Sequence, residues 1–310
     1  MAISAKEVSE LRAKTGVGMM DCKKALEEAG GNFEEAMKSL KERGLVVAAK
    51  KAERVAAEGL VDILYDEASG TAAMVEVNSE TDFVAKNEKF RAFARGCLDV
   101  ILEQKPADVG ELLSMPFDGG MTVDEALKDK ILQLGENMSI RRFVATTGVL
   151  STYIHNKGAI GVIVKVEADE AALSDEGFAE FKKNLALQIA SMKPLYVERG
   201  AVPASVIAEE KERIAEQIKE DEANAKKPPA VIEKMIEGKI RKYYEDNCLL
   251  EQGYVKAEDK MLVGEYIANY AKQTGGQVKV AEFHKFEKGE GIQKREDDFA
   301  GEIAKLTAGR

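Results

Sequence analysis

The sequence predicts an α+β fold assembled from several small modules. Three observations lead to this prediction: short, strongly capped helical patterns near the N-terminus, a strand–turn–strand–helix pattern that occurs twice, and helical apolar spacing over residues 203–246. The chain has 310 residues with 45% apolar content. It is therefore long enough to bury a substantial core, in about two or three globular domains.

Residues 1–54 are predicted to form a module of three short helices. Ser4 and Glu7 have the spacing of a capping box, so the first helix should begin after Ser4 and run to about Lys14. Glycines interrupt the pattern there, and a second helix is expected over residues 20–29.

The third helix should begin at a second capping box, formed by Asn32 and Glu35, and we expect it to stop at Gly44. The stretch that follows, residues 48–59, is rich in alanine and charged residues and lacks a clear apolar stripe. This composition favours a helical connector between modules over a core element.

An internal repeat then defines the middle of the chain. EGLVDILYDEASGTAAMVEVN starts at Glu58 and TGVLSTYIHNKGAIGVIVKVE starts at Thr147, and each has a strand, a polar turn with glycine, a strand and then a helix. At an offset of 88 or 89 residues the matched pairs are Tyr65 and Tyr153, Val77 and Val166, Phe90 and Phe178, and Phe93 and Phe181. We predict two related units, each a small antiparallel sheet covered by helices: residues 55–142, and residues 143–202 with 247–310.

The second unit contains an insertion at residues 203–246. Isoleucines at helical spacing occur on both arms: Ile207, Ile214, Ile218, Ile232, Ile236 and Ile240. The sequence KKPP, Lys226–Pro229, separates the arms, so an antiparallel helical hairpin that projects as a short coiled coil is predicted. Two roles stay open: an arm that packs on its own core, or a handle for docking or self-association.

After the insertion, KMLVGEYIANYAKQTGG from Lys260 reads as an amphipathic helix, and QVKVAEFHKFEKGEG alternates as an additional strand would. DDFAGEIAKL predicts a terminal helix. The stretch Lys105–Met121 contains no motif to which we assign a function.

Composition excludes several classes of protein. The formal net charge of −10 disfavours nucleic acid as a partner, because binding to phosphate backbones needs a basic surface. Cys22, Cys97 and Cys248 are odd in number and form no CxxC pair, which indicates free thiols in a reducing compartment and no zinc site. No signal sequence or apolar run of membrane-spanning length is found. We expect a cytoplasmic protein without a membrane contact.

A catalytic centre is not apparent. The two histidines, His155 and His284, lie in no recognisable arrangement of base and nucleophile, and the GxxxxGK[ST], GxGxxG, GxSxG and HExxH motifs are missing. The glycines of Gly16-Val17-Gly18 follow a helix, so a turn is the better interpretation of them. These observations favour a binding protein that uses no cofactor of its own.

The stretch NSETDFVAKN, residues 78–87, places Thr81, Asp82, Phe83 and Val84 directly after an apolar strand. One interpretation is structural: Asp82 caps the following helix and Phe83 packs beneath it. The other is functional. At the 89-residue offset the second copy has Glu-Ala-Ala at residues 170–172, so the fold tolerates loss of the motif, which favours the functional interpretation.

Four stretches together resemble bacterial elongation factor Ts. They are VSELRAKTGVGMMDCKKAL at Val8–Leu26, VNSETDFVAKN, GENMSIRR at Gly135–Arg142, and FEKGEGIQKREDDFA near the C-terminus. The resemblance extends over essentially the whole chain. It implies a three-helix, UBA-like N-terminal module, two related core subdomains, a helical-hairpin insertion and a C-terminal helical module.

The resemblance also implies a function. Members of this family exchange guanine nucleotide on elongation factor Tu, and their TDFV loop enters the GTPase near the magnesium ion and the nucleotide phosphates. By resemblance, Asp82 and Phe83 are the inserted residues, and Thr81 and Val84 shape the base of the loop.

Further partner contacts are implied at Arg12, Met19 and Met20, which match family positions that touch the GTPase domain, and at His155, which matches a position that faces another partner domain. The alternatives are that the methionines belong to the core of the three-helix bundle and that His155 is a polar turn residue. Two adjacent methionines on a helix do not both face one core, so at least one should be exposed.

Two other classes of function remain for comparison. An enzyme would need a cluster of acid, base or metal-ligating side chains, whereas a ubiquitin-like-binding adaptor would depend on residues 1–54 alone. The stoichiometry is also open, since the hairpin would allow either a homodimer in a two-plus-two assembly or a one-to-one complex.

Overall fold

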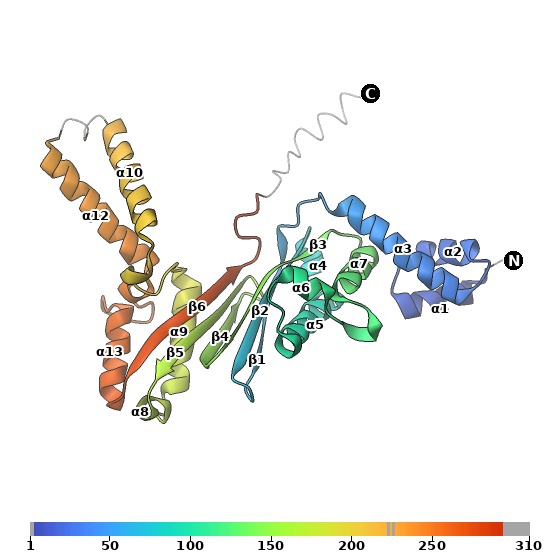
Figure 1. Cartoon of the computed structure of the whole chain (residues 1–310), viewed down its shortest axis with the longest axis horizontal. Helices are drawn as coiled ribbons and strands as arrows, with labels where there is room; N and C mark the ends of the chain where they lie inside the picture. Colours follow the sequence, from blue (N-terminus) through green and yellow to red (C-terminus); the bar gives the residue numbers. More distant parts are fainter. Residues whose placement is uncertain (1–2, 222–223, 225–226, 294–310) are drawn as a thin grey trace.

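The computed structural model describes residues 3–221, 224 and 227–293, and the terminal helix expected in DDFAGEIAKL lies outside them. The predicted α+β class is confirmed: helices surround two three-stranded antiparallel sheets with the strand orders β1-β2-β3 and β4-β5-β6. Figure 1 shows a helical module at one end, the two sheets in the middle and a helical arm at the other end.

The N-terminal module consists of α1 (Ala5–Thr15), α2 (Met19–Glu28) and α3 (Phe33–Lys51). The capping box of Ser4 and Glu7 is present, and Asn32 caps α3 by accepting from two backbone N–H groups. A separate apolar core holds the three helices together: Val8, Leu11, Val17, Cys22, Ala25, Leu26, Ala36 and Leu40.

The prediction that the third helix stops at Gly44 is wrong, because α3 continues to Lys51. Gly44 is buried and faces α7 (Val123–Leu134), with the Lys128 carbonyl 3.7 Å from the position of a Cβ at Gly44. A glycine inside a helix costs about 1 kcal/mol, and the packing of α3 against α7 offsets this cost. The expected helical connector is therefore the end of α3 followed by a turn and a few residues without regular secondary structure, before β1 begins.

The first sheet contains β1 (Glu58–Asp66), β2 (Thr71–Ser79) and β3 (Met138–Thr147), with β2 in the centre. The helices α5 (Glu88–Gln104), α6 (Val109–Ser114) and α7 enclose its core, which contains Phe90 and Phe93. The sequence interpretation missed β3, and this strand crosses the expected boundary at residues 142/143 because its pairing with β2 continues to Thr147.

The second sheet has the same plan, with β4 (Val149–His155), β5 (Ile160–Ala168) and β6 (Val278–Glu287). Its helices are α8 (Glu170–Leu173), α9 (Phe178–Met192) and α13 (Val263–Thr274). The register of each central strand with its third strand shifts at matching positions, between Glu76 and Val77 and between Lys165 and Val166, which leaves Arg141 of β3 and Ala281 of β6 as the bulged residues. Matching bulges at an 89-residue offset support the relationship between the two copies.

The two sheets pack against each other through a small apolar layer. It includes Val61 and Met74 from the first sheet and Leu150 and Ile163 from the second. The sheets approach each other closely at Gly161, since a Cβ there would be 2.5 Å from Val61 Cγ1. The two units therefore form one continuous body.

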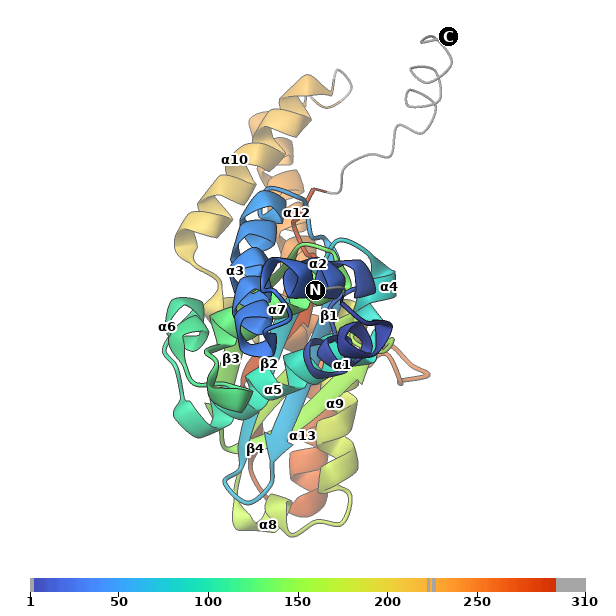
Figure 2. The same ribbon diagram turned by 90° about the vertical axis from the view of Figure 1, so that its right-hand side faces the viewer.

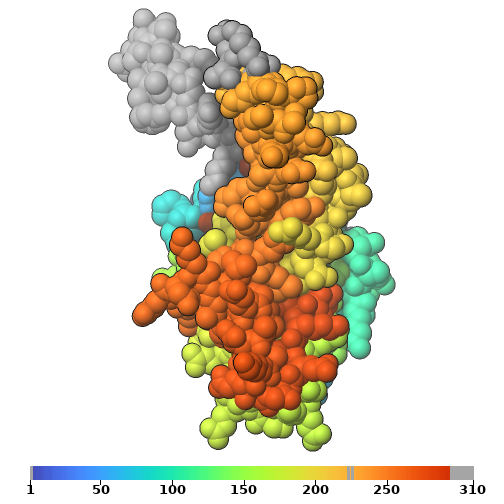
Figure 3. All heavy atoms as spheres, turned by 90° about the vertical axis from the view of Figure 1, so that its left-hand side faces the viewer, coloured from blue at the N-terminus to red at the C-terminus, as the bar shows by residue number. Residues whose placement is uncertain are grey.

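The inserted arm consists of α10 (Ala204–Glu220) and α12 (Pro229–Asn247), which run side by side away from the second sheet (Figure 1). Figure 3 shows the arm rising from the end of the body. Ile214, Ile218 and Ile240 are buried between the two helices, so the arm has an apolar core of its own.

The stretch Lys105–Met121 covers part of α5. It contains α6, and the Phe117 ring lies 5.7 Å from the Phe93 ring, over Gly96, where a Cβ would come within 2.6 Å of the Phe117 ring. Short 3-10 turns occur at Asp118–Gly120, Arg199–Ala201 and Leu249–Glu251. Among the described residues, every helix is too short or too polar to span a membrane.

Candidate functional site

The TDFV loop, Thr81–Val84, begins two residues after the end of β2 at Ser79. Its last three residues start the one-turn helix α4 (Asp82–Ala85), at the side of the body in Figure 2. Thr81 is the N-cap, and its Oγ1 accepts a hydrogen bond from the Val84 N–H at 3.4 Å. The hydroxyl of the buried Ser79 donates to the Thr81 carbonyl at 2.9 Å. The base of the loop is therefore bonded to the end of the strand.

The side chains of α4 divide into an anchor and an exposed group. Val84 is 8% exposed and belongs to the first core, whereas Phe83 is 79% exposed. A single helical turn is unstable by itself, so the buried Val84 and Ala85 hold the turn in place while Phe83 points to solvent. The interpretation that Phe83 packs beneath the helix is wrong, because Val84 occupies the buried position.

Asp82 does not cap the helix either, since Thr81 has that role. The Asp82 carboxylate forms an ion pair with Lys86 at 2.5 Å, and Lys86 Nζ lies 5.9 Å from the centre of the Phe83 ring. Both charged side chains are largely exposed, and such pairs contribute only about 0–1 kcal/mol. Asp82 can therefore exchange Lys86 for another partner at little cost.

Glu136, a residue that the sequence interpretation missed, forms hydrogen bonds with the first residue of the loop. The carboxylate of Glu136, between α7 and β3, accepts hydrogen bonds from the Thr81 N–H at 2.9 Å and the Thr81 hydroxyl at 2.6 Å. The only signal in the sequence was the stretch GENMSIRR, in which Glu136 had no assigned role. Its partner is 55 residues away, so no local pattern connects the two.

The secondary residues expected on the N-terminal module are all exposed. Arg12 is exposed on α1, and Met19 and Met20, at the start of α2, are 48% and 73% exposed. The interpretation of these methionines as bundle core is wrong, because Cys22, Ala25 and Leu26 form the buried face of α2.

His155 is the last residue of β4 and is exposed, with Nδ1 3.1 Å from the Tyr153 hydroxyl. The turn that follows lies against the first sheet, where the Gly158 carbonyl accepts from the Val61 N–H at 2.8 Å. Val61 is near the start of β1, which pairs with the end of β2. His155 and the TDFV loop therefore lie toward the same end of the sheets, although the contacts of each are separate.

Comparison with known proteins identifies the family. Residues 80–290 match the sequence model described as Elongation factor TS. The chain is 46% identical over 311 residues to Elongation factor Ts of Syntrophotalea carbinolica, an alignment that covers 99% of this chain and 100% of the relative. This chain belongs to the elongation factor Ts family. Other members include those of Clostridioides difficile, 46% identical, and Trichlorobacter lovleyi, 45% identical, each aligned over 98% of both chains.

Elongation factor Ts proteins are translation elongation factors that exchange nucleotide on elongation factor Tu, so membership agrees with the function that the resemblance implied. The family match starts at Glu80, directly before the TDFV loop, and includes Glu136 and His155. The longer alignments to the relatives also include the N-terminal module with Arg12, Met19 and Met20.

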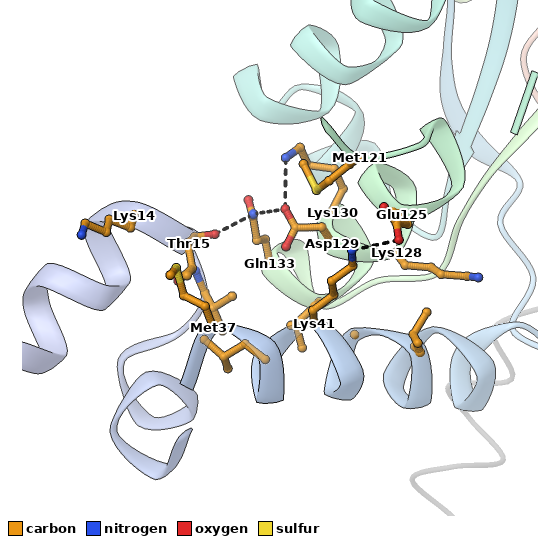
Figure 4. A pocket seen from close by; sticks show the side chains of 15 residues that line it. Lys14, Thr15, Met37, Lys41, Met121, Glu125, Lys128, Asp129, Lys130 and Gln133 are labelled. Carbon is orange, nitrogen blue, oxygen red and sulfur yellow. Dashed lines mark hydrogen bonds and ion pairs between the residues drawn. The ribbon is translucent and has the colours of Figure 1, made fainter. Parts of the chain in front are cut away.

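A cavity of about 410 Å³ lies where the N-terminal module meets α7, and residues of both line it (Figure 4). Polar groups in its lining bind one another: Gln133 Nε2 donates to the Thr15 carbonyl at 2.7 Å and to Asp129 at 2.6 Å. Lys41 pairs with Glu125 at 2.8 Å and lowers the pKa of that carboxyl through this hydrogen bond. Burial raises the pKa of Asp129. We interpret the cavity as part of the junction between the module and the body.

Within residues 3–221, 224 and 227–293, no group of three or more His, Cys, Asp and Glu side chains is arranged to hold a metal ion. The three cysteines are free and buried. What this surface offers to a partner is an exposed aromatic ring beside a carboxylate on a well-anchored turn.

Proposed function

We propose that this protein releases GDP from elongation factor Tu by inserting Asp82 and Phe83 into the GTPase near its magnesium and phosphate site. The observation that supports this proposal is the 79% exposure of Phe83 on a turn anchored by Val84 and Thr81. An exposed aromatic side chain on a fixed support is suited to a pocket in a partner.

Phe83 acts as an apolar wedge in this mechanism. Burial of a phenylalanine side chain contributes about 1.5–3 kcal/mol, which favours the partner conformation that accepts the ring. Asp82 accepts hydrogen bonds or places negative charge beside the magnesium ligands, and this weakens the hold of the GTPase on its nucleotide. Magnesium and nucleotide belong to the partner in this proposal, and the factor hydrolyses nothing.

The wedge alone is insufficient for exchange. A change in population from 1:99 to 99:1 needs about 5.5 kcal/mol of differential binding, so other contacts must also prefer the nucleotide-free partner. Arg12, Met19 and Met20 on the N-terminal module are proposed to contact the GTPase domain, and His155 a second partner domain. Their exposure supports these assignments.

Thermodynamic linkage sets the course of the reaction. If the factor lowers the affinity of elongation factor Tu for nucleotide, bound nucleotide lowers its affinity for the factor by the same ratio. Exchange therefore passes through a ternary complex in either direction, and high GDP or GTP displaces the factor. We place this activity in the cytoplasm, without direct contact to nucleic acid or membrane.

The role of the helical arm stays a prediction. The buried Ile214, Ile218 and Ile240 support an arm stabilised by its own core, and a homodimer through its outer surface is the alternative. Sedimentation velocity of the full chain, compared with a chain in which residues 204–247 are replaced by a short glycine-serine linker, distinguishes a dimer that depends on the arm from a monomer.

The experiment that tests the role of the loop measures release of a fluorescent GDP analogue from elongation factor Tu. Wild type is compared with Phe83→Ala and Asp82→Ala after circular dichroism has shown that both variants are folded. Leu173→Ala is a matched control, because Leu173 is an exposed apolar residue on the equivalent helix α8. We expect wild type and the control to accelerate release and the two loop variants to lose much of this effect.

Two other results would argue against the proposal. If wild type leaves the release rate unchanged, the protein is not an exchange factor for this GTPase. If wild type accelerates release and both loop variants match it, the exchange activity stands but the wedge lies elsewhere.

A further inference from the structure

The internal repeat provides a second copy of the TDFV region for comparison. In each unit a central strand leads to an N-cap and a one-turn helix, Thr81 with α4 in the first and Asp169 with α8 in the second. In each, the turn before the third strand starts at a left-handed glycine, Gly135 after α7 and Gly275 after α13. The two junctions are therefore built on the same backbone plan.

The side chains at these junctions are arranged in opposite ways. In the second unit the cap provides the carboxylate: Asp169 accepts from the Ala172 N–H at 3.1 Å and, across the junction, from the Gln277 N–H at 2.8 Å. Gly276 faces this carboxylate, and a Cβ there would lie 2.4 Å from Asp169 Oδ1.

In the first unit the cap is the neutral Thr81, and the carboxylate comes from the facing turn. Glu136 follows Gly135 as Gly276 follows Gly275, and it accepts both the N–H and the hydroxyl of Thr81. Charged acceptors form stronger hydrogen bonds than neutral ones. The start of α4 is thus held by a neighbouring segment, whereas α8 is held largely by its own cap.

The first unit also has one additional residue at this point. The strands β2 and β5 match at an offset of 89 residues, whereas the caps Thr81 and Asp169 match at 88, which corrects the alignment expected for the loop. The additional residue, Glu80, forms a second bond to the same turn, because its carboxylate accepts from the Asn137 N–H at 2.5 Å. The turn at residues 135–137 therefore forms hydrogen bonds with both residues that precede Asp82.

The same turn is bonded to the end of the N-terminal module. The Asn137 side chain donates to the Arg54 carbonyl at 2.7 Å, and Arg54 lies 3.6 Å from the Glu80 carboxylate. Lys51, at the end of α3, also donates to the Gly135 carbonyl. One short turn consequently connects the TDFV loop to the module that contains Met19 and Met20.

We propose that Glu136 is a positioning residue for nucleotide exchange: through its two hydrogen bonds to Thr81 it fixes the direction in which Phe83 projects. The inference rests on the proposed function of the TDFV loop. Glu136 acts through Thr81 and needs no contact with the partner. Loss of its carboxylate leaves the Thr81 N–H and hydroxyl without their acceptor and lets the single turn of α4 reorient around its Val84 anchor.

The test measures release of a fluorescent GDP analogue over a range of factor concentrations, which separates the maximal release rate from the half-saturating concentration. Misplacement of a reacting group by about 1 Å can cost about 100-fold in rate. For Glu136→Ala we expect the maximal rate to fall by about 10- to 100-fold, while the half-saturating concentration changes by less than about threefold, because most of the interface is intact. Glu136→Gln keeps one acceptor oxygen and should restore part of the rate.

Two double variants test the route of the effect. If Glu136 acts through the Thr81 hydroxyl and N–H, Thr81→Val combined with Glu136→Ala should lower the maximal release rate by less than the two single losses added together, because both substitutions remove the same hydrogen bond. If Glu136 acts by orienting the Phe83 ring, Glu136→Ala should not lower the maximal release rate further in a protein that already carries Phe83→Ala. Additive losses in both cases would overturn the inference.

Asp169→Ala is the matched control, since it removes the corresponding carboxylate from the second junction. It should lower the thermal unfolding midpoint without lowering the maximal release rate of the folded protein. Equal losses of rate in Asp169→Ala and Glu136→Ala would show a merely structural effect and overturn the inference. The proposed function fails separately, if wild type does not accelerate release or if Phe83→Ala is fully active.

Discussion

At the scale of single residues, the most buried charge in the described part of the chain is central to the body. The carboxylate of Glu76 is fully buried on β2 and accepts from Arg142 Nε at 2.7 Å, from Arg141 Nη1 at 3.1 Å and from the Gly289 N–H at 2.7 Å. A buried carboxylate needs several donors to compensate for lost hydration. Glu76 therefore bonds the first sheet to the segment that follows β6.

Glu76→Gln should destabilise the protein strongly. The substitution removes the negative charge and points an amide N–H₂ at arginine donors, and disruption of a buried ion pair costs about 3–5 kcal/mol. Urea unfolding followed by circular dichroism measures the change, with the exposed Glu103→Gln as control. A change below about 1 kcal/mol would show that the ion pairs of Glu76 contribute no more to stability than a pair on the surface does.

Cys97 should make the stability depend on alkaline pH. Burial raises the pKa of its thiol to about 12, whereas in the unfolded chain the thiol ionises near its usual pKa of about 8.5. The thiol has the higher pKa in the folded protein. Its contribution to the free energy of unfolding is therefore complete below the pKa of the unfolded chain, and it is lost as the pH rises toward the pKa of the folded protein. Between pH 9 and 10 we expect the free energy of unfolding to fall by up to about 1.4 kcal/mol through this group.

Urea midpoints at pH 8, 9 and 10 for wild type and Cys97→Ala check this expectation. The variant has no thiol at this position, so its stability should fall less steeply over the same range. Identical slopes in the two proteins would contradict a buried neutral thiol at residue 97.

At the scale of elements, α3 shows how tertiary packing overrides a local stop signal. Gly44 has a helical conformation, and a Cβ there would meet its neighbours at 3.7–4.0 Å, which is ordinary contact distance. The capping box at Ser4 and the N-cap at Asn32 gave correct starts for α1 and α3, although Glu35 does not complete the second predicted capping box. A cap depends on residues only two or three positions apart. The end of α3 depends on α7, which is about eighty residues further along the chain.

Gly44→Ala should stabilise the protein. Alanine is favoured over glycine inside a helix by about 0.8–1 kcal/mol, and the added methyl group has room beside Leu132. Thermal unfolding by differential scanning calorimetry should show a higher midpoint, and a lower one would mean that α3 and α7 are packed too tightly for a methyl group.

At the scale of the whole molecule, the contact between the two sheets makes one body of the two units. A Cβ at Gly161 would lie 2.5 Å from Val61 Cγ1 and 2.8 Å from Met74 Sδ. This close approach brings the second sheet, with His155, against the unit that holds the TDFV loop. The relative position of two proposed partner contacts therefore depends on a residue without a side chain.

Gly161→Ala should destabilise the protein by about 1–3 kcal/mol, as overpacking of a dense interior does. Val61→Ala in the same chain removes the methyl group that would clash and should recover part of the loss, so the two substitutions should be non-additive in a urea unfolding cycle. Simple additivity would indicate that the two residues are not in contact.

The sequence by itself determined the α+β class, the starts of the capped helices, the two strand hairpins and the arm, because caps, strand alternation and helical spacing depend on residues near one another in the chain. It also directed attention to Thr81–Val84, through a motif that only one copy of the repeat contains.

Only the tertiary structure decided which of those loop residues is exposed and what holds them. Val84 rather than Phe83 is buried because the core of the first unit lies on that side of α4, and Thr81 is bound by Glu136, 55 residues away. Likewise, β3 joins its sheet only by pairing with β2, and α3 passes Gly44 only because α7 packs there. Such contacts are created when distant segments meet, so they leave no periodic pattern in the sequence from which they could be predicted.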